Sequence, residues 1–82
     1  MPISEIEKNS QEVVRFDLIE FKGQLYADLR VYYEDGGEYK PSRKGLCIAP
    51  ELWPDFVHGI EALSAELEAR GLLDDEETEE AA

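Results

Sequence analysis

The chain has 82 residues, enough for one small domain, and a formal net charge of −12. A single core in a domain of this size supplies little net stability, so disulfides, metal ions or oligomerisation usually complete it. The single cysteine, Cys47, excludes an internal disulfide, and Cys47 with His58 gives too few ligands for structural zinc. We therefore expect a homodimer without a cofactor.

The first half of the chain predicts two antiparallel strands. Residues 1–12 are polar and acidic and show no period, which indicates a flexible acidic arm. Residues 13–21 alternate between apolar and polar side chains and predict a half-buried strand, which a turn at Lys22-Gly23 ends. Residues 25–33 alternate more regularly and predict the second strand.

The next segment predicts a hairpin and two short strands. Residues 34–37 end in two glycines, which can take the positive φ angles of a tight hairpin turn. Residues 38–40 and 44–48 predict a third and a fourth strand. We separate them because Pro41 cannot donate a hydrogen bond to a central ladder, so an edge or a bend is expected there.

After residue 49 the period becomes helical. Pro50 suits a first helical turn, and Gly71 suits a C-terminal cap. Apolar residues recur three and four positions apart, as on one face of a helix or along a coiled-coil seam. We predict that a second copy packs on this apolar stripe, which consists of Trp53, Phe56, Val57, Ile60, Leu63 and Leu67.

These elements together predict an α+β protein. A four-stranded antiparallel sheet and one long C-terminal helix, which forms the dimer, occupy residues 13–72. Residues 73–82 include a dense run of acids and predict a disordered acidic tail. That tail either improves solubility or competes with an anionic ligand for the basic side chains. No apolar run is long enough to cross a bilayer and no signal core is visible, so we expect a cytoplasmic protein.

The basic side chains are concentrated in the middle of the chain. Residues 15–45 hold six of the eight basic residues against six acids, whereas residues 46–82 hold only Arg70 against eleven acids. Non-specific binding of a single nucleic-acid strand needs cations along the phosphates and aromatic faces for the bases. Both residue types occur in the middle segment, despite the acidic total.

Two stretches resemble the positive cofactor four family of transcriptional coactivators. The first contains Phe21-Lys22-Gly23, Asp28-Leu29-Arg30 and Tyr32-Tyr33. The second is Lys40-Pro41-Ser42-Arg43-Lys44-Gly45-Leu46, followed by Pro50-Glu51-Leu52-Trp53. The resemblance extends over residues 13–70. It implies a homodimer joined through its helices, with strand ridges that hold unpaired nucleic-acid strands with little sequence preference.

The resemblance also implies which residues bind. Gln24 stands where the family usually has a second lysine, and Tyr33 where it usually has tryptophan, so we expect a weakened affinity. Arg30 and Tyr33 differ in parity. Either a bulge re-aims one of them, or Tyr32 stacks in place of Tyr33. The predicted nucleic-acid-binding residues are Arg15, Phe21, Lys22, Arg30, Tyr33, Lys40, Arg43 and Lys44.

We therefore expect a protein that binds single-stranded DNA, or RNA, and acts in transcription regulation or in DNA repair or replication. It would be associated with the nucleoid in a prokaryote or lie in the nucleus of a eukaryote. No spacing of residues indicates an enzyme.

The alternative is an acidic dimeric adaptor of the transcription machinery with weak or no nucleic-acid binding. Lys40, Arg43 and Lys44 discriminate between the two functions. Their burial in ion pairs favours the adaptor, and their exposure beside aromatic faces favours strand binding. Arg30 also has a purely structural alternative, an ion pair with Asp28 or Glu20 on the sheet.

Overall fold

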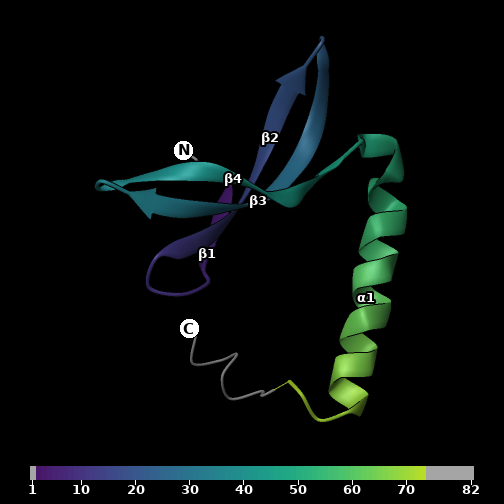
Figure 1. The fold of residues 1–82 in the computed structure, drawn as a ribbon. Coiled ribbons are helices and arrows are strands. Elements are labelled where there is room, and N and C mark those ends of the chain that lie inside the picture. The colour runs from purple at the N-terminus through teal and green to yellow at the C-terminus, as the bar shows by residue number, and fades with distance from the viewer. Residues whose placement is uncertain (1, 74–82) are drawn as a thin grey trace. The chain divides into compact units, whose positions relative to one another are not determined.

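The computed structural model describes residues 2–73. Within them, four strands precede a short 3-10 turn and one helix (Figure 1). The strands pair in chain order, each antiparallel to the next. The predicted fold, an antiparallel four-stranded sheet followed by a C-terminal helix, is confirmed. The elements are β1 (Ser4–Glu7), β2 (Glu12–Phe21), β3 (Gln24–Asp35), β4 (Glu38–Ile48), η1 (Pro50–Leu52) and α1 (Trp53–Ala69).

The four strands differ from the four that the sequence predicted. Strand β1 lies in the segment predicted as a flexible arm and pairs with β2 from Ser4 opposite Phe16 to Glu7 opposite Val13. The segments predicted as a third and a fourth strand form one strand, β4. Pro41 does not interrupt β4, because β4 is an outer strand of the sheet and an outer strand tolerates a missing N–H donor.

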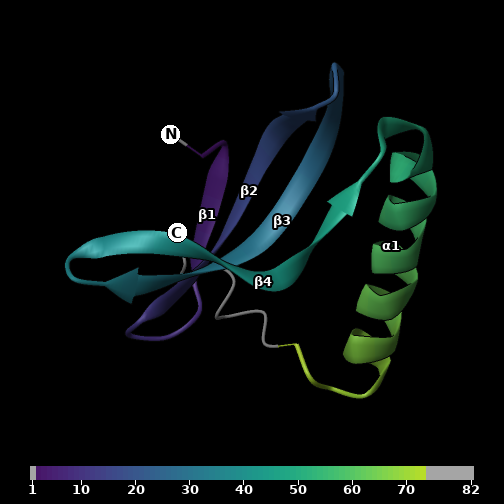
Figure 2. The ribbon, with the colours of Figure 1, turned by 45° about the horizontal axis from the view of Figure 1, so that its top comes forward.

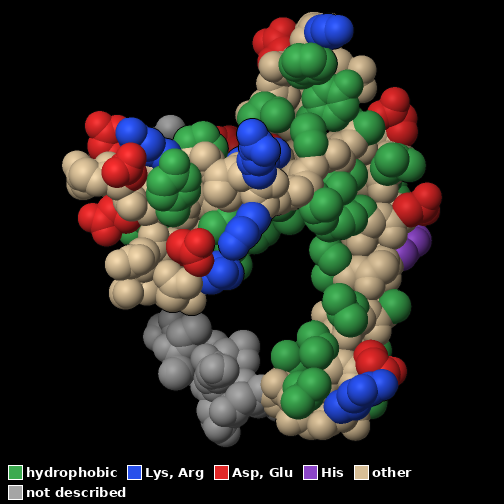
Figure 3. All heavy atoms as spheres, in the orientation of Figure 1, with side chains coloured by type: hydrophobic (Ala, Val, Ile, Leu, Met, Phe, Trp, Pro, Cys, Tyr) green, Lys and Arg blue, Asp and Glu red, His purple; other side chains and the backbone are tan. Residues whose placement is uncertain are grey.

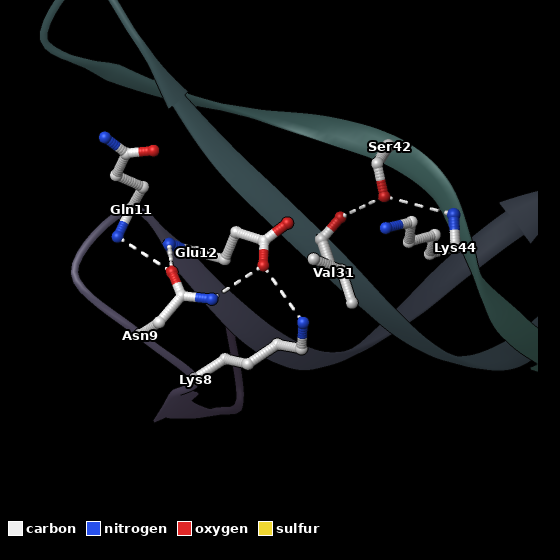
Figure 4. Close-up of polar contacts among 7 residues, drawn as sticks. All are labelled: Lys8, Asn9, Gln11, Glu12, Val31, Ser42 and Lys44. Carbon is white, nitrogen blue, oxygen red and sulfur yellow. Dashed lines mark hydrogen bonds and ion pairs between the residues drawn. The ribbon is translucent and has the colours of Figure 1, made fainter.

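Asn9 explains why the first segment folds back into a strand. Its Oδ1 accepts hydrogen bonds from the backbone N–H groups of Gln11 and Glu12, both at 2.9 Å (Figure 4). Its Nδ2 donates to the Glu12 carboxylate at 2.8 Å, and Lys8 Nζ donates to the same oxygen at 3.0 Å. Such local bonds replace a backbone turn, and they direct the chain from β1 into β2.

The other two strand connections are the tight turns that the sequence predicted. Lys22 and Gly23 have φ angles of 53° and 79°, and Gly36 and Gly37 have φ angles of 66° and 89°. Positive φ at both central positions of a two-residue loop matches the right-handed twist of the flanking strands. The sheet is strongly twisted, so the tips of these two hairpins point in different directions (Figures 1 and 2).

The register sorts the sheet's side chains onto two faces. One, the apolar face, carries Val14, Phe16, Leu18, Leu25, Ala27, Leu29, Val31, Leu46 and Ile48. The other, the mixed face, carries Val13, Arg15, Asp17, Ile19, Phe21, Tyr26, Asp28, Arg30 and Tyr32. Among the described residues, only Val13 (4% exposed) and Asp28 (5%) are buried, and both lie on the mixed face. The apolar face is half-buried to exposed.

The strands with η1 and the helix α1 form two compact units. Gly71, with a φ of 70°, ends the helix, as predicted. The Gly71 N–H donates to the Glu68 carbonyl at 3.0 Å and the Leu72 N–H to the Leu67 carbonyl at 2.9 Å, which is a Schellman cap. No helix among the described residues has the length and apolar character to span a membrane.

Candidate functional site

Two arginines lie side by side at the centre of the mixed face. Arg15 of β2 is directly opposite Arg30 of β3. Like charges in this position repel, but each guanidinium has a carboxylate partner. Arg15 Nε lies 2.8 Å from Glu5 Oε1, and Arg30 Nη2 lies 2.8 Å from Asp28 Oδ1. Because β1 supplies Glu5, the strand that the sequence did not predict completes this pair.

Arg15 also contacts two aromatic rings. Its guanidinium carbon lies 4.7 Å from the ring centroid of Tyr32 and 5.4 Å from that of Tyr39, which are cation–π distances. Arg15, Tyr32 and Tyr39 therefore form one cation–aromatic cluster across β2, β3 and β4.

A bulge in β4 shapes the exposed basic segment. Arg30 is opposite Gly45 and Tyr32 is opposite Pro41, so Val31 alone faces the segment 42–44. Ser42 holds this bulge: its Oγ donates to the Val31 carbonyl at 2.8 Å and accepts from the Lys44 N–H at 3.0 Å (Figure 4). The bulge presents Arg43 and Lys44, both exposed.

The structure brings some of the predicted binding residues together and separates others. Lys40, Arg43 and Lys44 are near one another on β4, at the end of β3 that carries Tyr33. Phe21 and Lys22 lie at the tip of the β2–β3 hairpin, at the opposite end of β3. There the Lys22 ammonium is 5.3 Å from the centroid of the Phe21 ring, and Phe21 is 59% exposed. These residues therefore form two groups, one at each end of β3, and the pair of Arg15 and Arg30 lies between them.

The parity of Arg30 and Tyr33 is not changed by the bulge. The pairing of β2 with β3 is unbroken from Phe21–Gln24 to Glu12–Tyr33, and the extra residues belong to β4. Tyr33 therefore shares the apolar face, where Lys40 is its partner on β4. Tyr32 shares the mixed face with Arg30.

The basic segment of β4 is exposed. Lys40 Nζ lies 3.2 Å from Asp35 Oδ2, but both side chains are about half exposed to solvent, and such pairs contribute little stability. Within residues 2–73, Arg43 and Lys44 make no ion pair. Lys and Arg side chains lie among hydrophobic side chains over the middle of the sheet (Figure 3).

Glu12 lies near this basic segment. Hydrogen bonds from Asn9 and then Lys8 lower the pKa of the Glu12 carboxyl, and the positive charge of Lys44 acts in the same direction. Glu12 is also directly opposite Tyr33. An anionic ligand at Lys44 would therefore meet one fixed negative charge.

The two ion pairs of the site differ in how far the sequence indicates them. The alternating Asp28-Leu29-Arg30 places its acid and its base on one strand face, and the structure confirms that Arg30 pairs with Asp28. Glu5 had no such signal, because its strand is too short to show a period.

No three acidic, histidine or cysteine side chains among residues 2–73 gather closely enough to hold a metal ion.

The fold and the exposed basic segment define a small α+β domain, a twisted antiparallel sheet with cationic and aromatic side chains and a single C-terminal helix. The model of the Transcriptional Coactivator p15 (PC4) family matches residues 8–59, and the chain belongs to this family. The resemblance read from the two motifs is thereby confirmed.

Two solved proteins illustrate the similarity. BPSL1147, a PC4 homolog from Burkholderia pseudomallei K96243, is 28% identical with a TM-score of 0.72, over 78% of this chain and 88% of that chain. MoSub1, crystallised in a complex with single-stranded DNA, is 34% identical with a TM-score of 0.60, over 82% of this chain and 78% of that chain. A second MoSub1–DNA complex gives 34% identity and a TM-score of 0.61, over 83% of this chain and 85% of that chain.

Proposed function

We propose that this chain binds single-stranded nucleic acid with little sequence preference. The observation that carries the proposal is the basic segment of β4, where Arg43 and Lys44 are exposed and make no ion pair among the described residues. Membership of the PC4 family and the similarity to MoSub1, which was crystallised with single-stranded DNA, support it.

The binding combines phosphate contacts with base stacking. Lys40, Arg43 and Lys44 contact successive phosphates, and each such contact contributes about 0.7 to the slope of log K against log salt for a single strand. Phe21 and Tyr33 offer exposed rings, each worth about 1–3 kcal/mol per stacked base. Phe21 and Tyr33 lie at opposite ends of β3, Phe21 on the mixed face and Tyr33 on the apolar face. A strand that contacts both rings therefore passes from one face of the twisted sheet to the other along β3. A duplex binds more weakly, because its bases are already stacked on one another.

The binding unit is a homodimer formed by α1. Ile60 and Leu63 of the apolar stripe are 44% and 61% exposed in the single chain, and their burial between two copies favours association.

The proposed dimer acts in the cytoplasm and has no catalytic activity. Its process is transcription regulation or DNA repair or replication, and proteins of the transcription machinery are candidate partners.

A fluorescence-anisotropy titration tests the binding. A labelled single-stranded oligonucleotide and its duplex are titrated with the full chain at low and moderate salt. The double variant Arg43→Ala/Lys44→Ala is expected to weaken binding and to lower the salt slope by about 1.4. Arg70→Ala removes the same kind of charge from the end of α1, where Arg70 pairs with Glu66, and leaves binding unchanged. No binding at low salt, or equal binding of the duplex, would contradict the proposal.

The net charge of −12 favours one other function, an adaptor for a basic protein partner. The same titration separates the two. If the chain is an adaptor, the titration shows no salt-dependent binding of the single strand. The affinity for the oligonucleotide is then also unchanged by the loss of Arg43 and Lys44.

A further inference from the structure

Asp28 is a buried carboxylate within a basic site. It is 5% exposed and lies at the centre of the sheet, between Asp17 of β2 and Cys47 of β4. Both of its oxygens are engaged by Arg30: Nη2 donates to Oδ1 at 2.8 Å and Nε donates to Oδ2 at 3.2 Å. These hydrogen bonds raise the pKa of the Arg30 guanidinium. A negative charge at this place opposes the binding of an anion, so electrostatics alone does not explain it.

A continuous set of contacts connects Asp28 with the bulge in β4. The third nitrogen of the Arg30 side chain, Nη1, donates to the Ser42 carbonyl at 3.2 Å. The Ser42 hydroxyl in turn accepts from the Lys44 N–H at 3.0 Å and donates to the Val31 carbonyl at 2.8 Å. The buried carboxylate is thus connected through one guanidinium and one serine to the exposed lysine.

We propose that Asp28 is a positioning residue for nucleic-acid binding, which it serves by fixing the Arg30 guanidinium and, through Ser42, the path of the β4 bulge that carries Arg43 and Lys44. This inference rests on the proposed function. An arginine side chain has many rotamers, and a bidentate carboxylate selects one of them. With the guanidinium fixed, its Nη1 holds the Ser42 carbonyl, and the exposed cations keep one geometry before the ligand arrives.

The direction in which the affinity changes distinguishes a positioning role of Asp28 from a simple effect of its charge. Asp28→Asn removes a negative charge, which by itself strengthens binding of an anion. Asp17→Asn is the matched control, because Asp17 lies directly opposite Asp28 and bonds only to the Leu18 N–H among the described residues. We expect Asp17→Asn to bind the single-stranded oligonucleotide as tightly as the wild type or more tightly. We expect Asp28→Asn to bind about tenfold more weakly, despite the same gain in charge.

Ser42→Ala provides a second test that changes no charge. It removes the hydroxyl that joins Val31 to Lys44 and leaves Asp28 and Arg30 paired. We expect weaker binding, with an effect that is less than additive when combined with Asp28→Asn, because both act on the same bulge. In both variants the Lys44 amide is expected to exchange its hydrogen faster, while the amides of the β2–β3 ladder keep their protection.

The outcomes distinguish the two proposals. If the wild type does not bind the oligonucleotide, the proposed function fails and the positioning role fails with it. If the wild type binds but folded Asp28→Asn matches Asp17→Asn, only the positioning role is overturned. If circular dichroism finds Asp28→Asn unfolded, Ser42→Ala decides: unchanged affinity and unchanged exchange of the Lys44 amide overturn the proposal.

Discussion

Gly45 of β4 lies directly opposite Arg30 of β3, and no side chain fits between the two backbones. A Cβ atom on Gly45 would be 2.5 Å from the Leu29 carbonyl oxygen and 2.8 Å from the Arg30 Cα. Both atoms belong to the backbone of β3, so neither can rotate away. This glycine is required for close approach of two strands and not for a turn.

Gly45→Ala is therefore expected to destabilise the protein by about 1–3 kcal/mol, the range that overpacking costs in protein cores. Gly59→Ala is the matched control, since a Cβ atom on Gly59 meets nothing within 4 Å in the chain. In the interior of α1 the same substitution is expected to stabilise by about 1 kcal/mol. Urea unfolding at one protein concentration measures both, and equal effects of the two substitutions would contradict the close approach.

Glu5→Gln is expected to release Arg15 from its carboxylate. The exposed ion pair contributes about 0.2–1 kcal/mol, so the free energy of unfolding falls only slightly. Binding of a single-stranded oligonucleotide tightens at low salt, because Arg15 becomes available to a phosphate. Glu7→Gln changes the same charge on the same side of β1, where Glu7 makes no ion pair among the described residues. If the two variants bind equally, the gain reflects net charge alone.

Leu63→Glu is expected to convert the proposed dimer into a monomer. Leu63 is 61% exposed in the single chain and lies on the apolar stripe of α1, so a charge there would have to be buried in the dimer. Ala62→Glu places the same charge outside the stripe and is expected to leave the dimer intact. Sedimentation equilibrium gives the mass of each, and a monomeric wild type would rule out dimerisation through α1.

The turn at Asn9 gives a pH dependence of stability. Because hydrogen bonds lower the pKa of Glu12 in the folded chain, its ionised form stabilises the fold. That contribution is complete above the ordinary carboxyl pKa of about 4.3, and it is lost as the pH falls through the lowered value. The difference in unfolding free energy between the wild type and Glu12→Gln should therefore be largest near neutral pH. Urea unfolding at neutral and acidic pH checks this, and a difference that grows in acid would contradict it.

The parts of the fold that the sequence predicted are those with long periodic patterns. The alternation over 25–33 and the helical stripe from Trp53 to Leu67 each repeat several times, so their types were clear. Strand β1 has only four residues, and its pairing with β2 depends on the turn at Asn9, a local motif that is too short to show a period. The acidic tail was predicted for residues 73–82, of which residues 74–82 lie outside the described residues.

The sequence predicted which residue types form the site better than it predicted how the strands arrange them. The basic and aromatic residue types near 40–44 indicated the exposed segment, but Pro41 suggested a break where the structure has a bulge. Sequence parity left Tyr32 and Tyr33 as alternatives for stacking. The register shows that Tyr32 is on the face of Arg30, although Arg15 already lies over its ring. Which tyrosine stacks on a base stays a prediction.

Strand β4 is an outer strand, and an unpartnered strand edge invites pairing with another chain. Here that edge carries a proline without an N–H donor, a bulge that interrupts the regular spacing of backbone groups, and three cationic side chains within five residues. Each of these features hinders the growth of an intermolecular sheet. The segment proposed to hold a nucleic-acid strand thus also protects the protein from aggregation, so selection for solubility and selection for binding act on the same residues.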